Sequence, residues 1–209
     1  MGLVVLKQAV SFTGKYEGYS DKAASEKKLL RDVFNKGDLF FNSGDLMTRD
    51  GDGFFYWSDR VGDTFRWRGE NVSTAEIENV LSRIPGVATV AVYGVSVPHT
   101  DGKAGMAAFI LSQTEPTITV EELLREVLSK SLMLPIYARP FFIRVLDSVS
   151  MTSTYKTQKS DLAKESFDPE IVKNHIYFCS WKSAGEQKYK IVPVSHEFVQ
   201  DLRDRKIAI

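Results

Sequence analysis

The sequence predicts an α+β fold in which helices pack on a small β-sheet. Between Val87 and Leu146, two apolar β-rich segments, a helix with an apolar stripe and a third β-rich segment follow one another. A further helix precedes them, because Ser73 and Glu76 have the spacing of a capping box and apolar residues follow at helical intervals over residues 77–84. A helix followed by strand, strand, helix and strand is typical of a compact α+β domain.

Composition excludes several classes of protein. The 209 residues are 43% hydrophobic, enough for a core, and 27 Lys and Arg balance 27 Asp and Glu. Zero net charge argues against a nucleic acid partner bound through a broad basic surface. The single cysteine, Cys179, excludes a disulfide scaffold and a cysteine-based zinc cluster. No apolar run reaches the length of a membrane span. We therefore expect a soluble, metal-free chain from a reducing compartment.

The N-terminal part has a different character from the rest. It opens on an abrupt apolar segment, and the turn sequence DGDG at residues 50–53 separates two strand-like segments, which predicts a β-hairpin. The apolar spacing over residues 29–37 predicts a short helix ending at Gly37. We predict two domains: residues 1–61 are the truncated end of a larger domain that contains the hairpin, and residues 62–209 are a C-terminal domain with a tail.

Three positions carry candidate chemistry. Asp45, in the sequence Ser-Gly-Asp, has a carboxylate suited to a ribose diol, and Arg60 lies beyond the hairpin, which can return it to the same place. Lys156 lies among small hydroxyl residues that leave its ammonium group free to meet an anion. Each also has an ordinary interpretation: a turn residue, a surface ion pair and a solvated lysine. The three histidines are scattered and suggest no site.

Several segments together resemble the acyl-adenylate-forming enzymes. They are FFNSGDL at 40–46, DGDGFFYWSDR at 50–60 and GDTFRWRGENVSTAEIENVL at 62–81. The segment GDTFRWRGENVST is similar to the corresponding segment of the fatty acid transport proteins, also called very-long-chain acyl-CoA synthetases. DGKAGMAA at 101–108, MTSTYK at 151–156 and the segment from Phe167 to Phe178 fit the same family. The resemblance covers essentially the whole chain in collinear order.

The resemblance implies roles for residues around the domain boundary. Asp45 matches the aspartate that holds the ribose hydroxyls of the adenosine, and Arg60 matches an arginine at the ribose and phosphate. Gly62 and Asp63 fall at the hinge about which the C-terminal domain of these enzymes turns. A glycine suits a hinge, because a hinge must absorb a large change in φ and ψ.

It also implies roles within the C-terminal domain. Gly69 matches the glycine beside which the pantetheine arm of CoA passes, and Arg68 and Glu70 would order that loop. Lys156 matches the lysine that approaches the acyl carboxylate and the α-phosphate during adenylation. The local sequence Thr-Tyr-Lys departs from the common Ser-Gly-Lys, so Lys159 is the alternative if the alignment slips.

The implied activity is that of an ATP-dependent long- or very-long-chain fatty acid–CoA ligase that supports fatty acid uptake. ATP with Mg, CoA and a fatty acid are the implied ligands, and the magnesium and acyl sites would lie in the large N-terminal domain, outside this chain. The resemblance also implies membrane association of the parent protein, at the endoplasmic reticulum, peroxisome or plasma membrane, and allows a homodimer. The chain alone is expected to be inactive.

Two alternatives stay open at this point. A truncated isoform would act as a non-catalytic interaction module that ignores nucleotide and CoA. A ligase for another carboxylic acid, such as a bile acid, would share all these motifs, because the acid's pocket lies outside the chain.

Overall fold

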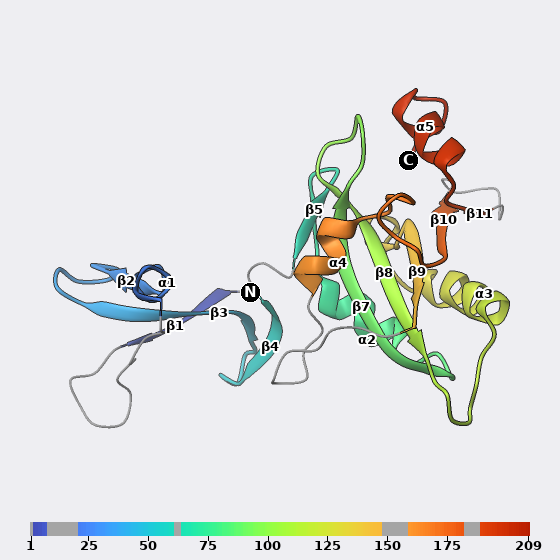
Figure 1. The fold of residues 1–209 in the computed structure, drawn as a ribbon. Coiled ribbons are helices and arrows are strands. Elements are labelled where there is room, and N and C mark those ends of the chain that lie inside the picture. Colours follow the sequence, from blue (N-terminus) through green and yellow to red (C-terminus); the bar gives the residue numbers. More distant parts are fainter. Residues whose placement is uncertain (1, 8–20, 61–63, 148–158, 182–188) are drawn as a thin grey trace. The chain divides into compact units, whose positions relative to one another are not determined.

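The computed structural model describes residues 2–7, 21–60, 64–147, 159–181 and 189–209. The chain divides into two compact units, residues 1–62 and residues 63–209 (Figure 1). The predicted domain boundary, after residue 61, lies one residue from this division. That the first unit is the end of a large adenylation domain stays a prediction.

The first unit is an antiparallel sheet built around one long strand, β3 (Leu39–Arg49). Strand β1 (Gly2–Lys7) pairs with one edge of β3, and β2 (Leu29–Arg31) and β4 (Phe55–Arg60) pair with successive parts of its other edge. The β3–β4 turn is held by Asp50, whose carboxylate accepts hydrogen bonds from the N–H groups of Asp52 and Phe54 at 3.0 and 2.9 Å. The hairpin predicted from DGDG is therefore present.

The prediction of a helix over residues 29–37 is wrong. Leu29–Arg31 forms strand β2, and the helix lies earlier, as α1 (Lys22–Glu26). The physical reason is the Asp38 carboxylate, which caps a loop instead of leaving its amides to a helix. It accepts hydrogen bonds at 2.8 to 3.0 Å from the N–H groups of Val33, Phe34 and Asn35.

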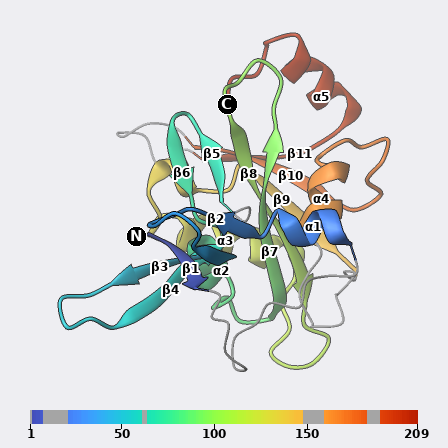
Figure 2. The ribbon, with the colours of Figure 1, turned by 90° about the vertical axis from the view of Figure 1, so that its left-hand side faces the viewer.

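The second unit contains a five-stranded sheet in the order β11-β10-β9-β8-β7 (Figure 1), and Figure 2 shows the same sheet from another side. Only β8 and β9 run parallel, and the crossover between them carries helix α3 (Val120–Ser131) and the 3₁₀ turn η1 (Ile136–Ala138). The other neighbours are antiparallel. The strands are β7 (Val87–Ser96), β8 (Lys103–Leu111), β9 (Phe142–Leu146), β10 (Ile176–Ser180) and β11 (Lys190–Pro193).

The helices of this unit begin where the sequence places their caps. Ser73 accepts a hydrogen bond from the N–H of Glu76 at the start of α2 (Thr74–Leu81), and Thr119 forms a complete capping box with Glu122 before α3. Helix α2 packs on β7 and on α3. Two further helices, α4 (Lys159–Glu165) and α5 (His196–Arg203), come after β9 in the chain. The predicted α+β fold with a small sheet and packed helices is confirmed.

The C-terminal region is part of the core, which the sequence did not indicate. We expected three strands ending at Leu146, a short helix around Leu162 and then a tail. The helix is present as α4, whereas β10 and β11 extend the sheet. Aromatic contacts bind this region to the centre: the ring of Phe142 stacks on Phe167 at 4.4 Å, and Phe178 lies 5.0 Å from Phe198 of α5. Burial of these rings is the main favourable term for closing such long-range contacts.

Cys179 provides a probe of this extended sheet. Its side chain is fully buried, and burial raises the pKa of the thiol to about 12. We predict that a thiol reagent at pH 8 leaves Cys179 unmodified in the folded chain and modifies it fully in urea. Mass spectrometry of the two samples checks this result, and rapid modification without urea would contradict the position of β10 inside the sheet.

Candidate functional site

Backbone pairing in the first unit brings Asp45 and Arg60 together. They are directly opposite each other in the β3–β4 ladder, although fifteen positions separate them in the sequence. Asp45 is half-buried. The hairpin therefore returns the backbone of Arg60 to that of Asp45, as the sequence suggested.

The backbone at Asp45 has a local irregularity. Between the pairs Val5–Asn42 and Leu3–Leu46, β3 has three residues where β1 has one, so Ser43, Gly44 and Asp45 form a bulge. Gly44 has a φ of +80°, and its N–H donates to Oδ1 of Asn42 at 2.9 Å. A bulge re-aims the side chain that follows it, which suits a residue that must face a ligand.

The second candidate element is the hairpin of β5 (Phe65–Trp67) and β6 (Glu70–Val72). Its turn consists of Arg68 and Gly69, which have φ values of +49° and +88°. Positive φ at both central residues is the pattern of a type I′ turn, which favours glycine but costs an arginine energy. Two contacts offset that cost: the Arg68 guanidinium lies 5.3 Å from the Trp67 ring, and it donates a hydrogen bond to the main-chain oxygen of Ile209.

Glycines on the sheet make room for this hairpin. Gly94 of β7 and Gly105 of β8 are paired, and the Phe65 side chain lies over both. A Cβ atom on Gly94 would come within 2.7 Å of Phe65, and one on Gly105 within 3.2 Å. Phe65 and Trp67 are both buried, so the hairpin is fixed to the sheet by apolar packing.

The loop between β7 and β8 approaches the hairpin even more closely. Gly102 forms a β-bridge with Trp67, and a Cβ on Gly102 would lie 2.2 Å from the main-chain oxygen of Arg66. Gly102 also has a φ of +85°. Only glycine fits both conditions, and the turn that carries Gly69 depends on this contact.

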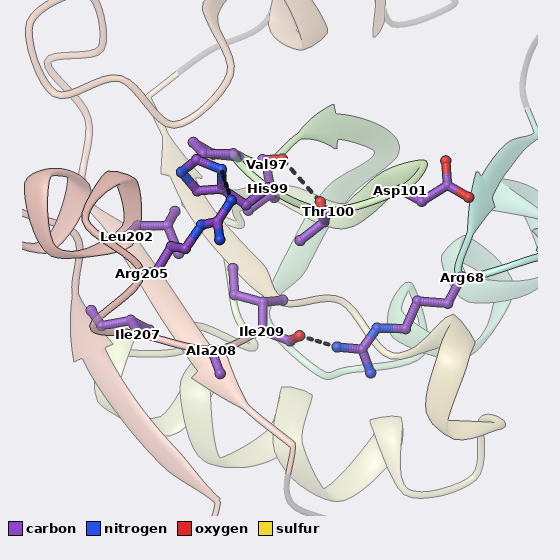
Figure 3. Close-up of a pocket in the computed structure, with 11 residues that line it drawn as sticks. Arg68, Val97, His99, Thr100, Asp101, Leu202, Arg205, Ile207, Ala208 and Ile209 are labelled. Atoms are coloured by element: carbon purple, nitrogen blue, oxygen red, sulfur yellow. Dashed lines mark hydrogen bonds between the residues drawn. The ribbon is translucent and has the colours of Figure 1, made fainter.

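A pocket of about 480 Å³ lies beside this turn. Figure 3 shows Arg68 on one side, His99 with Arg205 on the other, and Ile209 between them. His99 contacts the main-chain oxygen of Arg203 at 2.8 Å and the Arg205 guanidinium at 3.3 Å. The sequence gave no signal for this pocket, because its walls come from segments far apart in the chain.

Comparison with known proteins agrees with this architecture. Residues 76–156 match the model of the AMP-binding enzyme C-terminal domain. The chain is 46% identical to long-chain fatty acid transport protein 1 of Mus musculus over 170 residues, which are 80% of this chain and 25% of that protein. It is 38% identical to long-chain fatty acid transport protein 6 of Mus musculus over 209 residues, which are 100% of this chain and 32% of that protein.

Over its full length the chain is similar to the long-chain fatty acid transport proteins, and residues 76–156 are similar to the C-terminal domain of AMP-binding enzymes. The chain spans about a quarter to a third of the length of these curated relatives. The fold is also found in the anthranilate CoA ligase AuaEII in complex with anthranoyl-AMP, with a TM-score of 0.58 and 21% identity over 78% of this chain and 33% of that one. The predicted resemblance to this family is confirmed.

Of the predicted hinge residues and lysines, the structure describes only Lys159. Lys156, Gly62 and Asp63 lie outside the described residues. The alternative lysine, Lys159, is described, and it is engaged: its Nζ atom lies 2.8 Å from Oε1 of Glu78 and 3.0 Å from Oγ1 of Thr74. This ion pair gives Lys159 a partner within the second unit.

Two general features complete the description of the site. In the described parts of the chain, no three His, Cys, Asp or Glu side chains come together as metal ligands. Of the helices in the described ranges, none is both long enough and apolar enough to cross a bilayer.

The two turn glycines allow a matched test of the hairpin contact. Gly102→Ala adds both positive-φ strain and a clash with the Arg66 backbone, whereas Gly69→Ala adds only strain, because nothing lies within 4 Å of its Cβ position. We predict that Gly102→Ala lowers the free energy of unfolding by about 2–4 kcal/mol and Gly69→Ala by about 1 kcal/mol. Urea unfolding measures both values, and equal losses would contradict the close approach.

Proposed function

We propose that this chain is the C-terminal portion of an ATP-dependent long- or very-long-chain fatty acid–CoA ligase. The observation that carries the proposal is the similarity to long-chain fatty acid transport protein 6, which extends over all 209 residues at 38% identity. The matched C-terminal domain of AMP-binding enzymes supports the use of ATP. Because the chain spans only part of its relatives, the activity belongs to a longer parent polypeptide, and the chain alone is inactive.

The reaction has two steps on one carboxylic acid. In the first, a carboxylate oxygen of the fatty acid attacks the α-phosphorus of ATP, and pyrophosphate leaves with the electron pair of the broken P–O bond. In the second, the CoA thiol loses its proton and its sulfur attacks the acyl carbon, which expels AMP. Magnesium bound to ATP would neutralise phosphate charge in the first step.

The first unit supplies the nucleotide contacts. The Asp45 carboxylate accepts hydrogen bonds from the two ribose hydroxyls, which a carboxylate with two oxygens can do at once. Arg60, opposite it in the ladder, adds a positive charge for the ribose and phosphate. The bulge at residues 43–45 supports this role, because a bulge interrupts the regular alternation of side chains along a strand.

The second unit supplies different groups to the two steps. Lys156 places its ammonium group at the acyl carboxylate and α-phosphate during adenylation. The Arg68–Gly69 turn lines the path of the pantetheine arm during thioester formation, where the missing side chain of Gly69 leaves room for it. A hinge at Gly62 and Asp63 lets the second unit turn between one orientation for adenylation and another for thioester formation. The division of the chain between residues 62 and 63 supports this hinge.

In the cell, conversion of a fatty acid into its CoA ester traps it and maintains an inward gradient. This agrees with the word transport in the names of the relatives. We propose that the parent protein acts at a membrane, at the endoplasmic reticulum, the peroxisome or the plasma membrane.

The role of Lys156 can be tested by separating the two half-reactions in the parent ligase. We predict that Lys156→Ala slows adenylation by about 100-fold or more, because a fixed charge at the α-phosphate is lost, and leaves thioester formation from supplied acyl-adenylate nearly unchanged. Pyrophosphate release and acyl-CoA formation are the two measurements. Lys164→Ala, which removes an exposed lysine eight positions later in the sequence, serves as the control. Equal loss in both half-reactions would contradict the assignment.

For a substitution at the hinge we predict the opposite pattern: thioester formation falls and adenylation is retained. Gly62→Pro fixes φ near −65° and blocks the turn between poses, so thioester formation falls by about tenfold or more while adenylation continues. Gly62→Ala keeps a rotatable backbone and is the matched control. The same two assays measure the effect, and full thioester formation by Gly62→Pro would remove Gly62 from the hinge.

A further inference from the structure

We propose that Glu78 and Lys159 are positioning residues for adenylation, because their ion pair fixes the helix that begins three residues after Lys156. This inference rests on the proposed function. It concerns a contact between α2 and α4, and neither residue touches the reacting atoms.

Helix α4 (Lys159–Glu165) cannot be held in place by its own stability. It has seven residues, fewer than an isolated helix needs to persist in water, and none of its residues is fully buried. Leu162 and Ala163 are half-buried against the core. The position of α4 therefore depends strongly on the polar contacts of its first residue, Lys159, and its last residue, Glu165.

The first residue of α4 enters a shielded polar network. Lys159 and Glu78 have side chains only 23% and 24% exposed, and their charged atoms are 2.8 Å apart. Lys159 also donates to Thr74, which is buried, and the same oxygen of Glu78 accepts the N–H of Val92 at 2.7 Å. The start of α4 is thus connected to α2 and, through Glu78, to the backbone of β7. Figure 1 shows α4 alongside β7.

The last residue of α4 makes a second ion pair with another element. Glu165 lies 2.7 Å from Arg144 of β9, whose side chain is 5% exposed and also donates to Asn174 at 2.9 Å. The two ion pairs connect one end of α4 to helix α2 and the other end to strand β9. Partly buried pairs of this kind restrict geometry more than exposed ones, because water competes less for the charged groups.

The ion pair is linked to the reaction because Lys159 follows Lys156 closely in the sequence. Lys159 is three positions after Lys156 in the sequence, so the two Cα atoms lie within about 11 Å of each other whatever the conformation between them. A shift of the start of α4 therefore changes where the Lys156 ammonium group can be placed. A misplacement of about 1 Å in a reacting group can cost up to about 100-fold in rate.

The test uses the parent ligase with four variants. Lys159→Gln and Glu78→Gln each remove one charge, and Gln at position 78 can still accept the N–H of Val92. Lys159→Arg keeps the charge. Lys164→Gln removes the lysine of an exposed pair with Asp161 in the same helix, with exposures of 79% and 55%, and is the matched control.

We expect Lys159→Gln and Glu78→Gln each to lower the kcat of adenylation about tenfold, with KM for ATP and the rate of thioester formation changed less than about twofold. The double variant should lose no more than either single variant, because one interaction is removed in all three. Lys159→Arg should recover most of the rate, and Lys164→Gln should match the wild type.

Other outcomes overturn the inference. Equal losses in both half-reactions, together with a lower urea midpoint, would mean that the pair only stabilises the fold. No difference between Lys159→Gln and Lys164→Gln would mean that it has no part in positioning. Lys156→Ala measured alongside keeps the two proposals separate: if that variant adenylates normally, the role of Lys156 is wrong, whereas a Lys156-dependent ligase insensitive to Glu78→Gln contradicts only the positioning role.

Discussion

The close packing of the β5–β6 hairpin on the β7–β8 ribbon is the contact on which the second unit depends. It brings backbone to backbone at Gly102 and Arg66, and it places the Phe65 ring over Gly94 and Gly105. No other residue type leaves enough space at Gly94 and Gly102, so these positions fix both the location of the hairpin and the direction of its turn. The Arg68–Gly69 turn can then be exposed and still be well placed, because the buried residues behind it hold it.

The same unit combines two ways of holding an element in place. The hairpin and helices α2, α3 and α5 are held by buried apolar side chains, whereas the short helix α4 is held mainly by ion pairs at its ends. Apolar attraction has no preferred direction and fixes an element through the fit of its shape, whereas a shielded ion pair has a defined distance and direction. In the proposed ligase, the element that follows the adenylation lysine is the one held by directional contacts.

The sequence predicted local features well and long-range pairings poorly. Ser73 and Thr119 marked two helix starts, and the DGDG turn marked a hairpin, because each signal lies within a few residues of the structure it causes. The apolar spacing after Leu29 misled, because the Asp38 carboxylate satisfies the amides that a helix would have used. The partnership of Lys159 with Thr74 spans 85 positions and had no local signal. Among the site residues, the juxtaposition of Asp45 and Arg60 followed from the hairpin, whereas the pocket beside Arg68 required the folded C-terminal segment.

The size of the natural polypeptide tests the central claim most directly. An antibody raised against residues 190–209, used on an extract of the source tissue, reports the mass of every protein that carries this C-terminal segment. If the chain is the C-terminal portion of a ligase, the main band will be much heavier than the 23.5 kDa of the 209 residues. A single band near 23.5 kDa would contradict the account, because such a short chain would contain the hinge, the turn and the lysine without the domain on which they act.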